Sequence, residues 1–111
     1  MGDRELLELA AKAAGIEFND KRVCYPSPDL YIGPKNGRGW WNPLTDDGDA
    51  LRLAVKLRLD VCISVCRVGG EDGWYNAEAD EIGIEAATRR AIVKAAAEIG
   101  RNKEQGDGGG T

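Results

Sequence analysis

The sequence predicts an α+β fold, in which three helices pack with a mainly antiparallel sheet of three to five short strands. Apolar residues recur at helical spacing in three separate segments, whereas other segments alternate or are rich in β-branched and aromatic residues. Strands and helices do not alternate regularly, as a parallel sheet would require. The expected order is helix, short strands, helix, β-hairpin and helix.

The first helix is predicted at residues 3–14. Asp3 is its expected N-cap, and Gly15 is its expected C-terminal stop. Ile16 and Phe18 are expected to fold back onto the core. The apolar face of this helix is expected to consist of Leu6, Leu9, Ala10 and Ala13.

Two short strands are predicted next, at residues 21–25 and 30–32. Two prolines in segment 26–29 would break a strand ladder, so this segment is expected to turn. The glycine-rich segment 33–39 contains an Asn-Gly turn signal. We therefore expect residues 40–41 to pair back on residues 30–32 as a hairpin.

The stretch 40–51 is expected to organise the fold. Pro43 has no amide proton and pushes Asn42 toward an extended conformation, so the strand should end there. Because neighbouring side chains in an extended segment face opposite ways, Trp41 is expected inside the core and Trp40 nearer the surface. A structural role is therefore assigned to Trp41, Asn42, Pro43, Asp46 and Asp49.

A central helix is predicted at residues 46–58. Thr45, Asp46 and Asp47 are its candidate N-caps, since each carries a short oxygen-bearing side chain. Asp49 lies in the first turn, where the helix dipole favours a negative charge. The apolar stripe of this helix is expected to consist of Leu51, Ala54, Val55 and Leu59.

The clearest strand is predicted at residues 61–68, where β-branched residues occupy alternate positions. A turn at residues 69–73 and a returning strand at residues 74–78 complete a hairpin. The last helix is predicted at residues 85–99 with Gly100 as its stop, and its alanine-rich face should allow close packing. Its apolar face is expected to contain Ala87 or Thr88, Ala91, Ile92, Ala95 and Ile99, with Arg89, Arg90, Lys94 and Glu98 solvated.

The length of 111 residues indicates one domain, assigned to residues 1–100, followed by a disordered polar tail at residues 101–111. The net charge of −4 disfavours non-specific binding to nucleic acid and to anionic membranes. No apolar run is long enough to span a bilayer, and the acidic N-terminus does not resemble a signal peptide. A cytoplasmic protein is therefore expected.

The sequence contains no histidine, which excludes Ser-His-Asp and Cys-His catalysis and the common zinc hydrolase sites. The odd number of cysteines favours reduced, buried thiols at Cys24, Cys62 and Cys66. The acidic run 46–49 lacks the glutamate that a calcium loop needs at its twelfth position, which is Leu57. No metal, cofactor or catalytic residue is expected.

Two surfaces are candidates for binding. Lys35, Arg38 and Trp40 combine positive charge with a stacking surface, as single-strand nucleic-acid binders do, although nucleic acid is an unlikely partner for this acidic chain. The segment 71–98 carries seven acidic and three basic residues, and it could engage a basic protein. Its candidate contacts are Glu78, Asp80 and Glu81.

Three stretches carry a family resemblance: residues 5–15, residues 41–50 with Trp-Asn-Pro-Leu, and residues 87–96. Through them the chain resembles small accessory proteins encoded by tailed bacteriophages and prophages. More loosely it is similar to the NinX family of lambdoid phages and to phage alpha-beta-alpha sandwich proteins. The resemblance implies a phage origin and a location in the host cytoplasm, and it supplies no catalytic residues.

The leading functional hypothesis is a non-enzymatic accessory protein, monomeric or homodimeric, that binds a host or phage protein. A single-stranded nucleic-acid binder built on Lys35, Arg38 and Trp40 is one alternative. A small-molecule-binding domain, or an enzyme that uses carboxylates, is the other.

Overall fold

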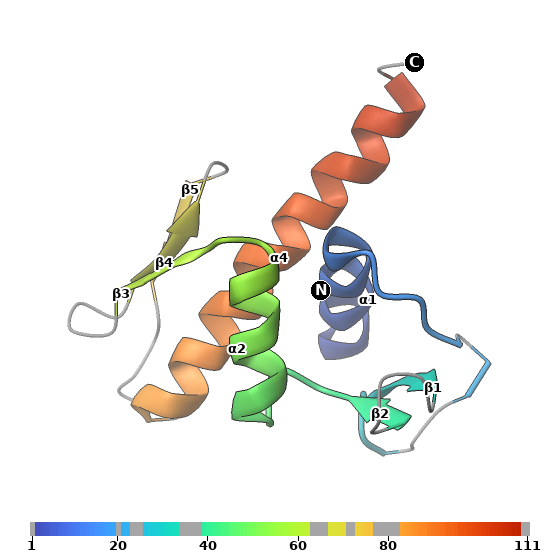
Figure 1. Cartoon of the computed structure of the whole chain (residues 1–111), viewed down its shortest axis with the longest axis horizontal. Helices are drawn as coiled ribbons and strands as arrows, with labels where there is room; N and C mark the ends of the chain where they lie inside the picture. The colour runs from blue at the N-terminus through green and yellow to red at the C-terminus, as the bar shows by residue number, and fades with distance from the viewer. Residues whose placement is uncertain are drawn as a thin grey trace.

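The computed structural model describes residues 2–19, 21–22, 26–33, 39–62, 67–70, 73–76 and 83–109. It confirms the α+β class but not a single sheet, because the described strands form two separate antiparallel sheets (Figure 1). Three strands stand where a two-stranded hairpin was predicted. The elements are α1 (Asp3–Ala14), β1 (Leu30–Gly33), β2 (Gly39–Trp41), α2 (Asp47–Lys56), β3 (Asp60–Cys62), β4 (Arg67–Gly70), β5 (Gly73–Asn76) and α4 (Ile84–Gly109).

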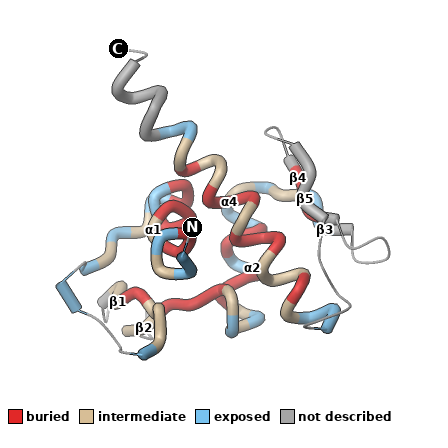
Figure 2. Tube along the Cα trace, turned by 180° about the vertical axis from the view of Figure 1, so that it is seen from behind, coloured by how far each residue is buried: buried red, intermediate tan, exposed pale blue. Residues whose placement is uncertain are grey.

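Helix α4 is the element that joins the parts of the fold. It contacts α1, α2, β4 and β5, and the two sheets lie on opposite sides of the three helices (Figure 1). Buried residues concentrate where the three helices meet (Figure 2). Those contributed by α4 are Ala87, Ala91, Ile92, Val93, Ala95, Ala96 and Ala97.

Gly100 lies where α4 crosses α1. A Cβ atom built on Gly100 would be 2.0 Å from the carbonyl oxygen of Leu9 and 2.8 Å from its carbonyl carbon. Only glycine allows this approach, so Gly100 makes a packing contact, and the helix stop predicted there is wrong. The helix continues to Gly109, and residues 101–109, expected to be disordered, are helical. Arginine, lysine, glutamate and glutamine in this segment are good helix formers.

Helix α1 follows its predicted boundaries. The C-cap at Gly15 is confirmed, because this residue has a left-handed φ of 70° and its N–H donates to the carbonyls of Ala11 and Lys12. The predicted N-cap is wrong by one residue: Gly2 holds that position, and Asp3 pairs with Arg90 of α4 instead. The predicted apolar face is buried, and Ile16 and Phe18 pack against the core as expected.

The β1–β2 hairpin confirms the predicted pairing, with Leu30 opposite Trp41 and Tyr31 opposite Trp40. Trp41 is buried, with 4% of its surface exposed, and Pro43 is fully buried. Trp40 is half-buried. The strand predicted at residues 21–25 is not seen, since residues 21–22 have no strand conformation and residues 23–25 lie outside the described part.

The single strand predicted at residues 61–68 is wrong. β3 ends at Cys62, and β4 begins at Arg67 and runs antiparallel to it, with Val61 opposite Val68. The segment between the two strands, residues 63–66, lies outside the described residues. A hairpin is present as predicted, formed by β4 and β5, but Gly69, Gly70 and Gly73, predicted as turn residues, lie in its strands, with Gly70 opposite Gly73. Cys24 and Cys66 lie outside the described residues, and for Cys62 the structure describes the backbone but not the side chain.

The apolar stripe predicted for α2 is wrong at Leu51 and Val55, whereas Leu59 packs partly buried against the core as predicted. Leu51 and Val55 are 65% and 67% exposed, whereas Leu53 is 2% exposed and Ala54 is buried as predicted. Both sides of α2 carry apolar side chains, so periodicity alone could not choose between them. The buried Asp49 lies one turn before Leu53 on the same face. In the described part of the chain, no helix is long and apolar enough to cross a membrane.

Candidate functional site

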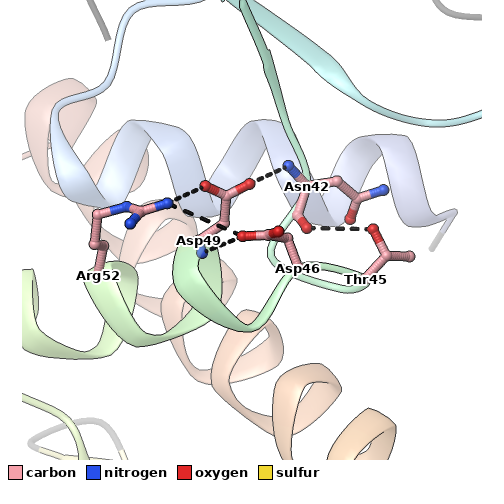
Figure 3. Close-up of polar contacts among 5 residues, drawn as sticks. All are labelled: Asn42, Thr45, Asp46, Asp49 and Arg52. Atoms are coloured by element: carbon pink, nitrogen blue, oxygen red, sulfur yellow. Dashed lines mark hydrogen bonds and ion pairs between the residues drawn. The ribbon is translucent and has the colours of Figure 1, made fainter. Parts of the chain in front are cut away.

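The N-terminus of α2 is held by a network of carboxylates (Figure 3). Asp46 is the N-cap, and its Oδ2 accepts the Asp49 N–H at 2.8 Å. The buried Asp49 accepts the Asn42 N–H at 3.0 Å through Oδ2 and an Arg52 N–H at 2.9 Å through Oδ1. Asp46 is thus selected from the three candidate caps. The network has the form of a helix cap.

Asn42 connects this network to the rest of the fold. Its side-chain amide donates to Asp29 at 2.6 Å, and its Oδ1 accepts the Leu44 N–H at 2.9 Å. Its carbonyl also accepts from the Thr45 N–H and hydroxyl. Only 5% of the residue is exposed. Asn42, Asp46 and Asp49 are therefore joined in one set of hydrogen bonds at the start of α2.

The hairpin carries an arginine–aromatic cluster. The Arg22 guanidinium lies 3.9 Å from the Tyr31 ring centroid and 5.7 Å from that of Trp40, and the two rings meet edge to face at 5.2 Å. Sequence reasoning found Trp40 but missed Arg22 and Tyr31. No local sequence pattern indicates which distant residues the folded hairpin brings together. Lys35 and Arg38 lie outside the described residues, as do Glu78, Asp80 and Glu81.

An apolar groove lies between α2 and α4. Its volume is about 510 Å³. Among the described residues the exposed large hydrophobic side chains are Leu51, Val55, Val61 and Ile84, and three of these four line the groove. Val55 follows Leu51 by one turn of α2, and so lies on the same side of the helix. We call this feature the α2–α4 groove; its apolar lining is Ala50, Leu51, Ala54, Val61, Ile84 and Ile92.

The rim of the α2–α4 groove is polar. Arg89 reaches from α4 toward α2, where its Nε donates to the Leu44 carbonyl at 2.9 Å and its Nη1 pairs with Asp47. Its side chain is only 19% exposed, which corrects the expectation that Arg89 is solvated. Asp47 and Glu85 make the lining net acidic.

One polar atom in this lining is unsatisfied. The Thr88 hydroxyl is buried and has no hydrogen-bond partner among the described residues. A buried hydroxyl without a partner is costly, and such groups are rare in native structures. Because this oxygen is shielded from solvent, a molecule in the groove does not reach it in this conformation, and the atom gives no argument for an occupant.

The lining of the groove combines apolar side chains with the Thr88 hydroxyl and with three charged side chains, those of Asp47, Glu85 and Arg89. Within the described residues, no group of three cysteine or acidic side chains is arranged to hold a metal ion.

Comparison with models of known protein families, with curated proteins and with solved structures finds no match to this chain.

Proposed function

We propose that this chain is a non-enzymatic accessory protein that acts by binding another protein through the α2–α4 groove. The carrying observation is the clustering of exposed apolar side chains: Leu51, Val61 and Ile84 line one groove of a small acidic protein, and Val55 follows Leu51 by one turn of α2. Gathered apolar side chains with a polar rim are typical of interaction sites.

The occupant that fits this groove is an amphipathic helix of another protein. Leu51 and Val55 form a stripe along α2, and Ile84 faces it from the start of α4, so the groove has two apolar walls. Helix-in-groove recognition uses leucine-sized anchors spaced by one turn. Asp47 is paired with Arg89, so Glu85 gives the lining its net negative charge, which favours a basic residue beside those anchors.

A second copy of the chain fits less well. A two-fold interface brings a surface patch against itself, so the acidic rim would meet an acidic rim. Opposed like charges cost free energy, and the net charge of −4 adds to this repulsion at long range. A basic partner removes both the repulsion between the two rims and the repulsion between the two net charges. The resemblance to phage accessory proteins suggests that such a partner lies in the bacterial host or among other phage products.

The nucleic-acid alternative has less support. The Arg22 guanidinium already lies over the Tyr31 ring, which is the surface that a base would use for stacking. Trp40 is half-buried with its ring against Tyr31. Salt-dependent quenching of tryptophan fluorescence by oligonucleotides, lost in Trp40→Ala, would favour this alternative over protein binding.

The test is a peptide titration followed by backbone amide shifts in NMR spectra. The probe is a helical peptide with leucines at one-turn spacing and flanking lysines; the comparison peptides have glutamates in place of the lysines, or a scrambled sequence. We expect the lysine peptide to bind most tightly and to shift amides of α2 and the first turns of α4.

The matched variants are Leu51→Ser with Val55→Ser, and Lys103→Ser as an exposed control on α4. Because Leu51 and Val55 are 65% and 67% exposed, the double variant should fold normally. It should lose at least about tenfold in affinity for the lysine peptide, and the control should lose nothing. Equal binding by all three proteins would overturn the proposal. So would a concentration-dependent dimer that the double variant abolishes, because the groove would then serve self-association.

A further inference from the structure

A second pocket lies on the other side of α2, against the end of α1 and the β1–β2 hairpin. It has a volume of about 230 Å³. It uses residues of α2 that do not line the α2–α4 groove, namely Asp49, Arg52, Leu53 and Lys56. The proposed function therefore does not account for this pocket, and the two sites are independent.

The pocket has an apolar interior and a cationic edge. Its apolar lining includes Trp41 and Leu53, which are 4% and 2% exposed. Arg52 and Lys56 follow each other by one turn on α2, and both are exposed at the edge. The remaining apolar lining comes from Ala14, Ile16 and Ile32.

The acidic residue of the pocket is already neutralised. Asp49 accepts hydrogen bonds from the Asn42 N–H and from Arg52. The Lys56 ammonium has no ion-pair partner among the described residues. Arg52 also lies 4.0 Å from Asp46, so two carboxylates surround its charge, and the positive charge of the lining that lacks a carboxylate partner among the described residues is that of Lys56. This positive charge favours an anion.

We propose that this pocket binds a small monocarboxylic acid, with its apolar body against Trp41 and Leu53 and its carboxylate at Lys56. A volume of about 230 Å³ lies below the range of about 300–1,000 Å³ typical of drug-sized ligands, so nucleotides are too large. A neutral or cationic compound of the same shape gains nothing from the Lys56 ammonium.

The test uses hexanoate as the probe and follows the Trp41 indole N–H in NMR spectra of the full chain. Hexanol and hexylamine are the matched compounds, because they have the same alkyl chain length with a neutral or a positively charged head group. Hexanoate should shift the Trp41 signal to saturation, with a dissociation constant of about 1 mM, as expected for a ligand of this size. Hexanol and hexylamine should bind at least about tenfold more weakly.

The site-directed arm compares Lys56→Gln with Lys94→Gln, which removes the same charge from α4, away from the pocket. Lys56→Gln should weaken hexanoate binding by about fivefold and leave the fold intact, because the side chain is exposed. Lys94→Gln should bind like the wild type. Acetyl-leucine and acetyl-leucine amide extend the test. If acetyl-leucine binds at least as tightly as hexanoate and the amide does not bind, the ligand of the pocket is assigned as the C-terminus of a peptide.

Three results would overturn the proposal. They are the absence of saturable shifts at Trp41, equal binding of hexanol and hexanoate, and equal binding by the Lys56→Gln and wild-type proteins. None of them bears on the α2–α4 groove, because the peptide experiment uses different residues and a different probe.

Discussion

Helix α4 meets its two partner helices in opposite ways. Against α1 it presents alanines and Gly100, and the backbones approach so closely that a Cβ on Gly100 would overlap the Leu9 carbonyl. Against α2 it leaves a groove of about 510 Å³ with Leu51 and Ile84 exposed at it. One helix thus forms a closed contact on one side and an open one on the other.

The difference shows that, within one helix, small side chains contribute to the stability of the fold and larger exposed ones are available for binding. Small residues allow close backbone contact, and the dispersion energy of that contact stabilises the fold. Larger apolar residues without a partner leave surface that only another molecule can cover. We therefore expect substitutions on the α1 side to change stability and substitutions on the groove side to change binding.

The largest expected effect is that of Gly100→Leu. Helix propensity alone would make leucine better than glycine in a helix by up to about 1 kcal/mol. The overlap with the Leu9 backbone should reverse that sign and destabilise the protein by more than about 4 kcal/mol, since backbone atoms must move. Urea denaturation measures the change. The control is Gly2→Ala, where a Cβ meets nothing within 4 Å and the change should stay within about 1 kcal/mol. A stabilised Gly100→Leu protein would show that the close crossing does not exist.

A second comparison uses two leucines of α2. Leu53→Ala should lower the free energy of unfolding by about 2–5 kcal/mol, because this side chain is 2% exposed in the core. Leu51→Ala should change it by no more than about 0.5 kcal/mol, because 65% of the residue is exposed. Thermal denaturation of the two variants separates these values. Equal losses would mean that the groove wall is part of the core.

The smallest expected effect concerns two neighbouring arginines of α4. Arg89 bonds the Leu44 carbonyl and Asp47 on the α2 side, whereas Arg90 pairs with Asp3 on the α1 side. Arg89→Met should cost about 1–2 kcal/mol, because the half-buried bond to Leu44 is lost. Arg90→Met should cost less than about 0.5 kcal/mol, since its ion pair is partly solvated. Denaturation at low and high salt measures both, and a larger loss for Arg90 would contradict the comparison.

Local chemistry made part of this fold predictable. The caps at Gly15 and Asp46, the inward Trp41 and the pairing of residues 40–41 with 30–32 each follow from a few neighbouring residues. Gly100 was misread because a glycine that ends a helix and a glycine that admits another helix look alike in sequence.

The surfaces were less predictable, because they depend on tertiary packing. Leu51 and Leu53 have the same hydrophobicity, and only the position of α2 in the fold decides which one is exposed. The α2–α4 groove therefore had no signal in the sequence. Arg22 likewise reaches Tyr31 and Trp40 only through the folded hairpin. Of the candidate binding residues named from sequence, Trp40 lies in the described part of the chain.

The contacts of Asn42 have a consequence for the timing of local opening. Through its side chain and its N–H, this residue bonds Asp29 ahead of the hairpin and Asp49 within α2. Neither segment can separate from the other without breaking a bond to the same buried residue. Segments linked in this way tend to open together as one cooperative unit. The amides of β2 and of the first turn of α2 should therefore exchange with deuterium at a common rate, although one lies in a strand and the other in a helix.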